Sequence, residues 1–252
     1  EQNRHAIKKI MTTGGNGMMR LHEKPICGYI PAGTVNDFAS SLRIPKVMRH
    51  AAELVTQGKV FRCDLGSFND KFFTYVAGFG AFTEVSYTTP QEWKNMLGKT
   101  AYFIEGLKHL AEIKPHHMRI TYDEGVVEDD FVLGLVSNSV SVAGYKAYKK
   151  EDIKMDDGLF EVLFIRDLKN ALELQEVLNA LLTKHLDATK MFRCSSRHLH
   201  IVCDDEVQWT LDGEDGGSWD EVDLFNHQQV LPIICGDEAL EDISSQMVGE
   251  PE

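Results

Sequence analysis

The sequence predicts two regions, a short α/β segment followed by a longer, mainly-β region that contains two helices. Before Lys59, a short apolar run passes through a turn with proline and glycine into a helical pattern. After Lys59, apolar runs bounded by turn residues recur, which is typical of antiparallel sheets. The sequence contains no internal repeat and no low-complexity linker.

In the first region, residues 25–34 (PICGYIPAGT) predict a short buried strand that enters a turn. The helix TVNDFASSLRI follows, and Thr34 or Asn36 is a suitable N-cap. In the second region, runs at 60–65 and 71–77 predict a hairpin because Asn69-Asp70 is a turn signal.

Further along the second region, apolar residues at a helical period predict helices over 89–113 and 168–186. Residues 116–140 predict a strand, a turn at 123–125 and a second strand, and 158–165 predict another strand. The remaining sequence predicts four short runs separated by turn residues, at 198–205, 207–214, 221–226 and 228–235.

The bulk composition excludes several classes of protein. With 252 residues, 43% of them hydrophobic, the chain is long enough for one large or two small domains. A formal net charge of −13 argues against general binding of nucleic acid and against broad adhesion to anionic membranes. The five scattered cysteines form no CxxC pair, so we expect a reducing compartment. Because neither a signal peptide nor an apolar run of about 20 residues is present, we expect a cytoplasmic protein.

The turn at residues 31–37 has the chemistry of an anion site, because backbone N–H groups at a helix N-terminus favour negative charge. Thr34 adds a hydroxyl donor. Asp37 would repel bare phosphate, but it suits a site where it helps to hold Mg²⁺. The alternative, a capped turn without a ligand, stays open because small glycine turns are weak signals.

Two other turns are acidic. Asp212 and Glu214 flank Gly213, and two carboxylates so close can divide the roles of base and of metal or charge partner. Asp156 and Asp157 precede a glycine and a strand, where they could bind a hard cation. In each case an ordinary solvated turn is the alternative.

Taken together, these segments resemble a known family. GYIPAGTVNDFASSLRIP is similar to the pattern GxxPxGTxNDFAxxLxIP of the diacylglycerol kinase catalytic-domain family, which includes bacterial soluble diacylglycerol kinases and sphingosine kinases. TLDGE, DDGLFEV and VAGFGAFTEVSY look like its other landmarks, in the same order. The resemblance extends from about Gly14 to about Cys235, and its PxGTxNDFA segment is highly specific.

The resemblance implies an N-terminal α/β domain that binds ATP and a C-terminal β-sandwich-like domain that binds lipid, with the active site in the cleft between them. It places a partial nucleotide-binding domain at 1–58, the lipid-substrate domain at 59–228, and a segment that returns to the first domain at 229–252. Such an enzyme would transfer phosphate from ATP to diacylglycerol, or a similar lipid alcohol, to form phosphatidate.

Site residues also follow from the resemblance. Gly14, Gly15 and Thr34 would bind ATP, and Asp37 and Asp64 would belong to the network that places the catalytic Mg²⁺.

The same resemblance makes Asp212 the general base, with Asn36 and Glu214 in supporting roles. It makes Asp157 a ligand of a structural Mg²⁺, together with two backbone carbonyls, those of Lys154 and Leu159.

A lipid substrate implies transient contact with the inner face of the membrane, and the family often dimerises, so a homodimer is a further expectation. Two other functions stay open. The chain could be a kinase of another acceptor, similar to NAD kinase, or a lipid-binding protein that has lost catalysis.

The sequence departs from the family pattern at the phosphate loop GGDGT. Gly14-Gly15 is followed by Asn16-Gly17. The spacing suggests missing segments before Gly14 and between Gly15 and Asn16. Either the sequence lacks parts of the natural protein, or the loop has truly been lost; the intact mass of the natural protein distinguishes the two.

Overall fold

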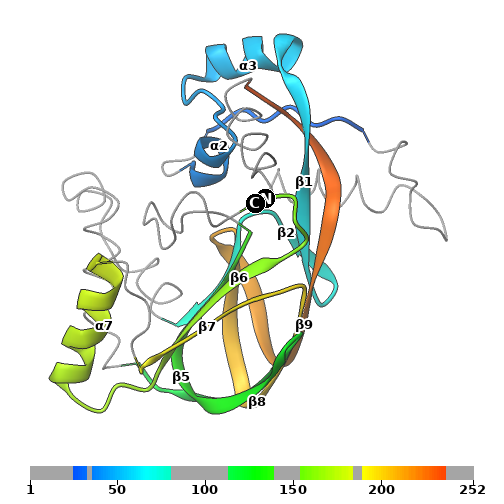
Figure 1. Ribbon diagram of the computed structural model, residues 1–252. Helices are drawn as coiled ribbons and strands as arrows, with labels where there is room; N and C mark the ends of the chain where they lie inside the picture. Colours follow the sequence, from blue (N-terminus) through cyan, green and yellow to red (C-terminus); the bar gives the residue numbers. More distant parts are fainter. Residues whose placement is uncertain (1–24, 33–35, 81–112, 139–153, 184–188, 237–252) are drawn as a thin grey trace, which may run out of the picture.

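The computed structural model describes residues 25–32, 36–80, 113–138, 154–183 and 189–236 (Figure 1). Two helices of the first region, α2 (Asp37–Ser41) and α3 (Met48–Gln57), lie together at one end of the molecule. The helix α7 (Ala171–Thr183) lies beside the sheet and confirms the second predicted helix, with shorter bounds. The predicted helix at 89–113 lies outside the described residues.

The strands of the described residues form one antiparallel sheet, in the order β2-β1-β9-β8-β3-β5-β6-β7, and β4 pairs with both β5 and β8. Since β3 also pairs with β5 and β8, β3 and β4 both lie between these two long strands, at successive positions along them. The strand bounds are β1 (Lys59–Phe68), β2 (Lys71–Phe73), β3 (Val76–Gly80), β4 (His116–Tyr122), β5 (Gly125–Ser137), β6 (Phe160–Arg166), β7 (Met191–Ser196), β8 (His198–Leu211) and β9 (Glu214–Cys235).

The predicted turns at Asn69-Asp70 and at 123–125 are confirmed, but the prediction for the residues after 198 is wrong. Asn69-Asp70 joins β1 to β2, with Phe68 paired to Lys71. The four short runs after residue 198 are two long strands, β8 and β9. The polar residues that suggested turns lie where the strand register shifts. One shift follows Val202 in the pairing of β8 with β9, and the other lies opposite Asp64 in the pairing of β1 with β9. Long strands can contain such irregularities without ending.

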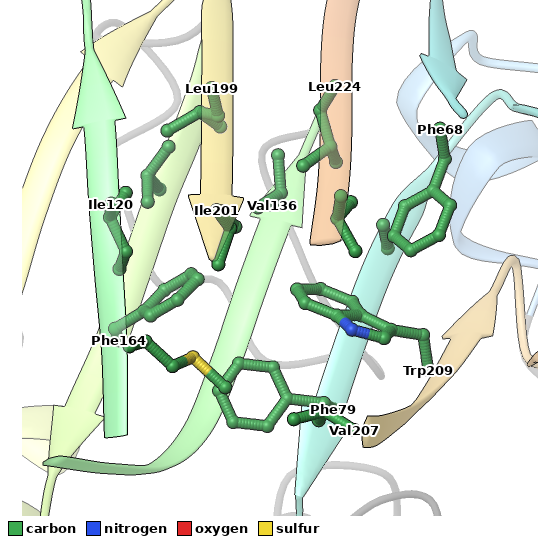
Figure 2. Packing of buried hydrophobic residues seen from close by; sticks show 14 of the residues in the cluster. Phe68, Phe79, Ile120, Val136, Phe164, Leu199, Ile201, Val207, Trp209 and Leu224 are labelled. Atoms are coloured by element: carbon green, nitrogen blue, oxygen red, sulfur yellow. The ribbon is translucent and has the colours of Figure 1, made fainter. Parts of the chain in front are cut away.

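The larger hydrophobic core contains residues from eight of the described strands, β1 to β6, β8 and β9 (Figure 2). Trp209 is fully buried and packs edge-on against Phe68 and Phe79, with ring centroids 5.1 and 4.9 Å apart. Gly134 lets Phe79 approach, because a Cβ atom there would lie 2.2 Å from Phe79 Cε1. These aromatic contacts fix the strands that carry the candidate site.

A second, smaller core joins α2 and α3 to the end of β9. It contains Phe38, Leu42 and Ala51 from the helical segments, and Leu231 and Ile233 from β9. Figure 1 shows β1 and β9 running side by side from the sheet towards α3. The first region is therefore attached to the β-rich region through β1, which carries Asp64, and β9, which pairs with it.

Candidate active site

The turn between β8 and β9 consists of Asp212 and Gly213. Their φ angles are 54° and 82°, and Leu211 pairs with Glu214 across the turn. Two central residues with positive φ are the requirement of a type I′ hairpin, for which Asp-Gly is a preferred sequence. The expectation of an ordinary turn is therefore correct for the backbone, and the turn also carries the candidate carboxylates.

The Asp212 carboxylate is held by four donors from one segment between β2 and β3. Its Oδ2 accepts hydrogen bonds from the backbone N–H of Thr74 (2.8 Å) and from the Thr74 hydroxyl (3.1 Å). Its Oδ1 accepts the N–H groups of Tyr75 (2.8 Å) and Val76 (3.0 Å). The sequence predicted β2 and β3 as one strand. The strand is interrupted because these N–H groups bind Asp212 and are not available for the hydrogen bonds of a continuous sheet.

Burial raises the pKa of Asp212, while the hydrogen bonds from residues 74–76 act in the opposite direction. Burial and the nearby Asp212 charge also raise the pKa of Tyr29. Tyr29 comes from the first region and packs edge-on against Phe38 of α2, with centroids 5.4 Å apart. Asp212 therefore lies close to the boundary between the two regions.

Asp64 is completely buried on β1, opposite a bulge in β9. Its carboxylate accepts the N–H groups of Gly158 (2.6 Å) and Gln229 (2.7 Å). Its backbone N–H donates to the Met155 carbonyl (2.8 Å), and its own carbonyl accepts from Asn138 Nδ2 (3.1 Å). Gln229 has a φ of 54°, which turns its N–H out of the strand ladder towards the carboxylate.

Burial raises the pKa of Asp64 to about 6, against the lowering effect of its two backbone donors. The charges of Asp157 and Asp156 raise it further. Burial also raises the pKa of both these aspartates, and Asp157 adds to the effect on Asp156. Three carboxyl groups thus repel one another in a half-buried place, an arrangement that a cation would relieve.

The segment 154–159 links these carboxylates to the smaller core. Met155 is buried in that core. Asp157 Oδ1 accepts the N–H of Leu159 at 3.0 Å. Lys154 is exposed. The sequence assigned Asp64 and Asp157 to separate magnesium sites, whereas the structure places Asp64 against the segment that contains Asp157.

The other predicted residues are distributed as follows. Glu214 is exposed at the start of β9. Asn36 occupies the N-cap position of α2 with a φ of 53°, but its side chain makes no capping hydrogen bond. Asp37 is the first residue of α2. Gly14, Gly15 and Thr34 lie outside the described residues, as does the predicted missing loop.

Sequence reasoning missed three residues that hold the two aspartates. Thr74 and Gln229 donate to their carboxylates, and Asn138 donates to the backbone carbonyl of Asp64. None of them belongs to a recognisable turn or motif of its own. Thr74 and Asn138 are among the few buried polar residues of the described chain, at 8% and 1% exposure. Polar residues next to long apolar runs, as in FVLGLVSN, are the signal that could have drawn attention to Asn138.

Two family models match the chain. Residues 10–68 match the diacylglycerol kinase catalytic domain, and residues 76–233 match the YegS C-terminal NAD kinase beta sandwich-like domain. The diacylglycerol kinase of Bacillus subtilis is 31% identical over 219 residues, which are 86% of this chain and 72% of the relative. That of Staphylococcus epidermidis is 32% identical over 219 residues, 86% of this chain and 68% of the relative.

Solved structures agree. The crystal structure of a diacylglycerol kinase from Bacillus anthracis is 25% identical, with a TM-score of 0.67, and the match covers 86% of this chain and 71% of that one. A β-sandwich-like domain joined to part of a kinase catalytic domain defines a lipid kinase. The chain belongs to the diacylglycerol kinase family, which confirms the resemblance and the predicted fold class.

Proposed function

We propose that the protein transfers the γ-phosphate of ATP to the hydroxyl group of diacylglycerol, or of a similar lipid alcohol, in a reaction that uses Mg²⁺. The observation that carries this proposal is the placement of two anchored carboxylates, Asp64 and Asp212, where the two hydrophobic cores meet. Phosphoryl transfer asks the protein mainly to position the acceptor and to balance charge, which anchored carboxylates suit. The names of the relatives support diacylglycerol as the acceptor.

For the general base we keep Asp212. Its raised pKa brings it closer to the range in which a carboxylate accepts a proton effectively. Its four hydrogen bonds, however, occupy about four acceptor positions, the usual number for a carboxylate. To accept a proton, Asp212 must release one donor, and the Thr74 hydroxyl, at 3.1 Å, is the longest of the four contacts.

Glu214 is a second candidate base, and the saturation of Asp212 is the observation that favours it. Glu214 is exposed on the same turn, two residues further on. In this arrangement Asp212 would fix the turn while Glu214 removes the proton. Either choice keeps the chemistry on the β8–β9 turn.

Among the described residues, no group of three or more histidine, cysteine or acidic side chains is arranged to hold a metal ion. The proposed magnesium site at 154–159 therefore combines backbone carbonyls with a carboxylate. All these ligands are oxygen atoms, which Mg²⁺ prefers. Asp157 and the carbonyls of Lys154 and Leu159 would hold a structural Mg²⁺, and the repulsion around Asp64 favours a cation there. Asp37 and Asp64 would serve the catalytic Mg²⁺. The ion supplies charge neutralisation of the phosphates when it is bound.

We also propose the domain boundaries expected above, at 58 and 228. The smaller core supports the boundary at 228, because Leu231 and Ile233 from the last segment pack with α2 and α3. It does not mark the boundary at 58, because Phe61 and Cys63 of β1 belong to the same core. Within the described residues no helix is both long and apolar enough to cross a membrane. Transient contact with a membrane surface would give access to the lipid.

The test is transfer of labelled phosphate from ATP, with Mg²⁺, to a panel of lipid alcohols in mixed micelles, using the complete natural chain. Labelled phosphatidate from diacylglycerol is the expected product. Transfer to no lipid would refute the proposal. Phosphorylation of NAD instead would favour an acceptor of another class, and lipid binding without transfer would favour a protein that has lost catalysis.

The base is assigned with Asp212→Asn and Glu214→Gln, compared with Glu176→Gln, an exposed carboxylate on α7. If Asp212 is the base, Asp212→Asn abolishes turnover while ATP binding persists, and Glu214→Gln retains the pH dependence of wild-type kcat. If Glu214→Gln abolishes turnover with an unchanged melting temperature, the role passes to Glu214. Melting temperatures are needed because Asp212→Asn also disturbs the bonds to residues 74–76.

A further inference from the structure

Asp64 and Asp212 lie far apart in the sequence, yet a short chain of direct hydrogen bonds joins them through Asn138. Asn138 follows β5 and is 1% exposed. Its backbone N–H donates to the carbonyl of Tyr75 at 3.0 Å, and its side-chain Nδ2 donates to the carbonyl of Asp64 at 3.1 Å. Asn138 is therefore hydrogen-bonded both to Tyr75, which binds the Asp212 carboxylate, and to the backbone of Asp64.

Further hydrogen bonds hold the residues at both ends of this series, Tyr75 and Asp64. Tyr75 donates its N–H to Asp212 Oδ1 at 2.8 Å, so the peptide units on both sides of Tyr75 take part. At the other end, the Asp64 carboxylate is fixed by two backbone donors, and its carbonyl is oriented by Asn138. A displacement of Asn138 would therefore change the position of one carboxylate relative to the other.

The side chain of Asn138 is not explained by packing alone. Its Oδ1 is buried and has no hydrogen-bond partner among the described residues. A buried polar atom without a partner is unfavourable, so an apolar residue of similar size would suit the packing better. The Nδ2 bond to Asp64 is the contact that an apolar residue could not make.

We propose that Asn138 is a positioning residue that holds Asp64 and the Asp212 turn in a fixed relation for phosphoryl transfer. This inference rests on the proposed function, because it needs both carboxylates to take part in the reaction. Asn138 itself touches neither carboxylate group and acts through the backbone on both sides.

The experiment compares Asn138→Ala with Asn226→Ala in the complete chain. Asn226 is a matched control because it is an equally buried asparagine, 1% exposed, whose side-chain atoms have no partner among the described residues. The substitution at 138 removes the bond to Asp64 and keeps the backbone bond to Tyr75. We expect kcat to fall about tenfold in Asn138→Ala, with KM for ATP and lipid nearly unchanged, and to stay within about twofold in Asn226→Ala.

A double-mutant cycle with Thr74→Val tests the link directly, since this change removes the hydroxyl that holds Asp212 from the other side. We expect the two substitutions to be non-additive, both in kcat and in the free energy of unfolding. An unchanged kcat in Asn138→Ala, equal losses in both asparagine variants, or full additivity would overturn the inference. If the wild-type protein transfers phosphate to no lipid, the proposed function is refuted instead. The double-mutant cycle in the free energy of unfolding would then still test whether Asn138 and the Asp212 turn are coupled.

Discussion

Replacing Asp64 with asparagine should remove a pH-dependent part of the stability of this protein. The side chain is completely buried, and burial is the main reason why its pKa rises from 3.8 to about 6. A carboxyl group whose pKa is higher in the folded chain than in the unfolded chain favours folding while it is protonated. Its contribution is therefore present below about pH 4 and is lost as the pH rises through about 6.

The difference between the two pKa values corresponds to about 3 kcal/mol in the free energy of unfolding. Asparagine does not titrate, but it lowers the free energy of unfolding by an amount that does not depend on pH. Its single carbonyl oxygen can replace the acceptor for one of the two buried N–H groups, those of Gly158 and Gln229. The other N–H then lacks its acceptor, at a cost of about 1–3 kcal/mol at every pH.

Asp64→Asn should consequently be less stable than the wild type near pH 4.5 and about equally stable, or more stable, at pH 8. The measurement is urea unfolding across this range in the presence of EDTA, with Glu176→Gln as an exposed control. Because the unfolded carboxyl group is already mostly ionised at pH 4.5, the difference in the free energy of unfolding between wild type and Asp64→Asn should change by about 2 kcal/mol across this range, mostly below pH 7. A difference that does not depend on pH would refute the reasoning, because it would mean that Asp64 titrates alike in both states.

Three further predictions follow from the packing and the acidic segment. In urea unfolding, Gly134→Ala should lower the free energy of unfolding by about 1–3 kcal/mol, because the added Cβ overlaps with Phe79. The control Gly125→Ala should change it by less than about 0.5 kcal/mol, because its added Cβ would lie at least 3.5 Å from any neighbour. Addition of Mg²⁺ should raise the melting temperature of the wild type, and Asp157→Asn should lose most of that increase in differential scanning fluorimetry; an equal increase in both would place the ion elsewhere. Trp209→Ala should cost about 3–5 kcal/mol in the free energy of unfolding. Trp209→Phe should cost clearly less, because the buried indole Nε1 has no hydrogen-bond partner among the described residues; equal losses in chemical denaturation would contradict this.

The sequence identified most elements whose signals are local. The Asn69-Asp70 and Asp212-Gly213 turns follow from residues that accept positive φ, and the strands beside them follow from short apolar runs bounded by turn residues. The family resemblance also pointed to the candidate acidic residues, because PxGTxNDFA is a highly specific pattern and TLDGE occurs in the same order as in the family. The sequence could not tell that residues 198–235 form two long strands, since polar residues in a bulge look the same as those in a turn.

The sequence by itself determined that this chain is a member of a lipid kinase family with a β-rich second region and a carboxylate on a tight turn. The tertiary structure alone decided what those carboxylates contact. Asp64 meets Gly158 and Gln229, which are 94 and 165 residues away, and Asp212 meets residues 74–76. Such contacts arise because buried backbone N–H groups that leave a strand ladder must find another acceptor, and the fold determines which carboxylate lies within reach.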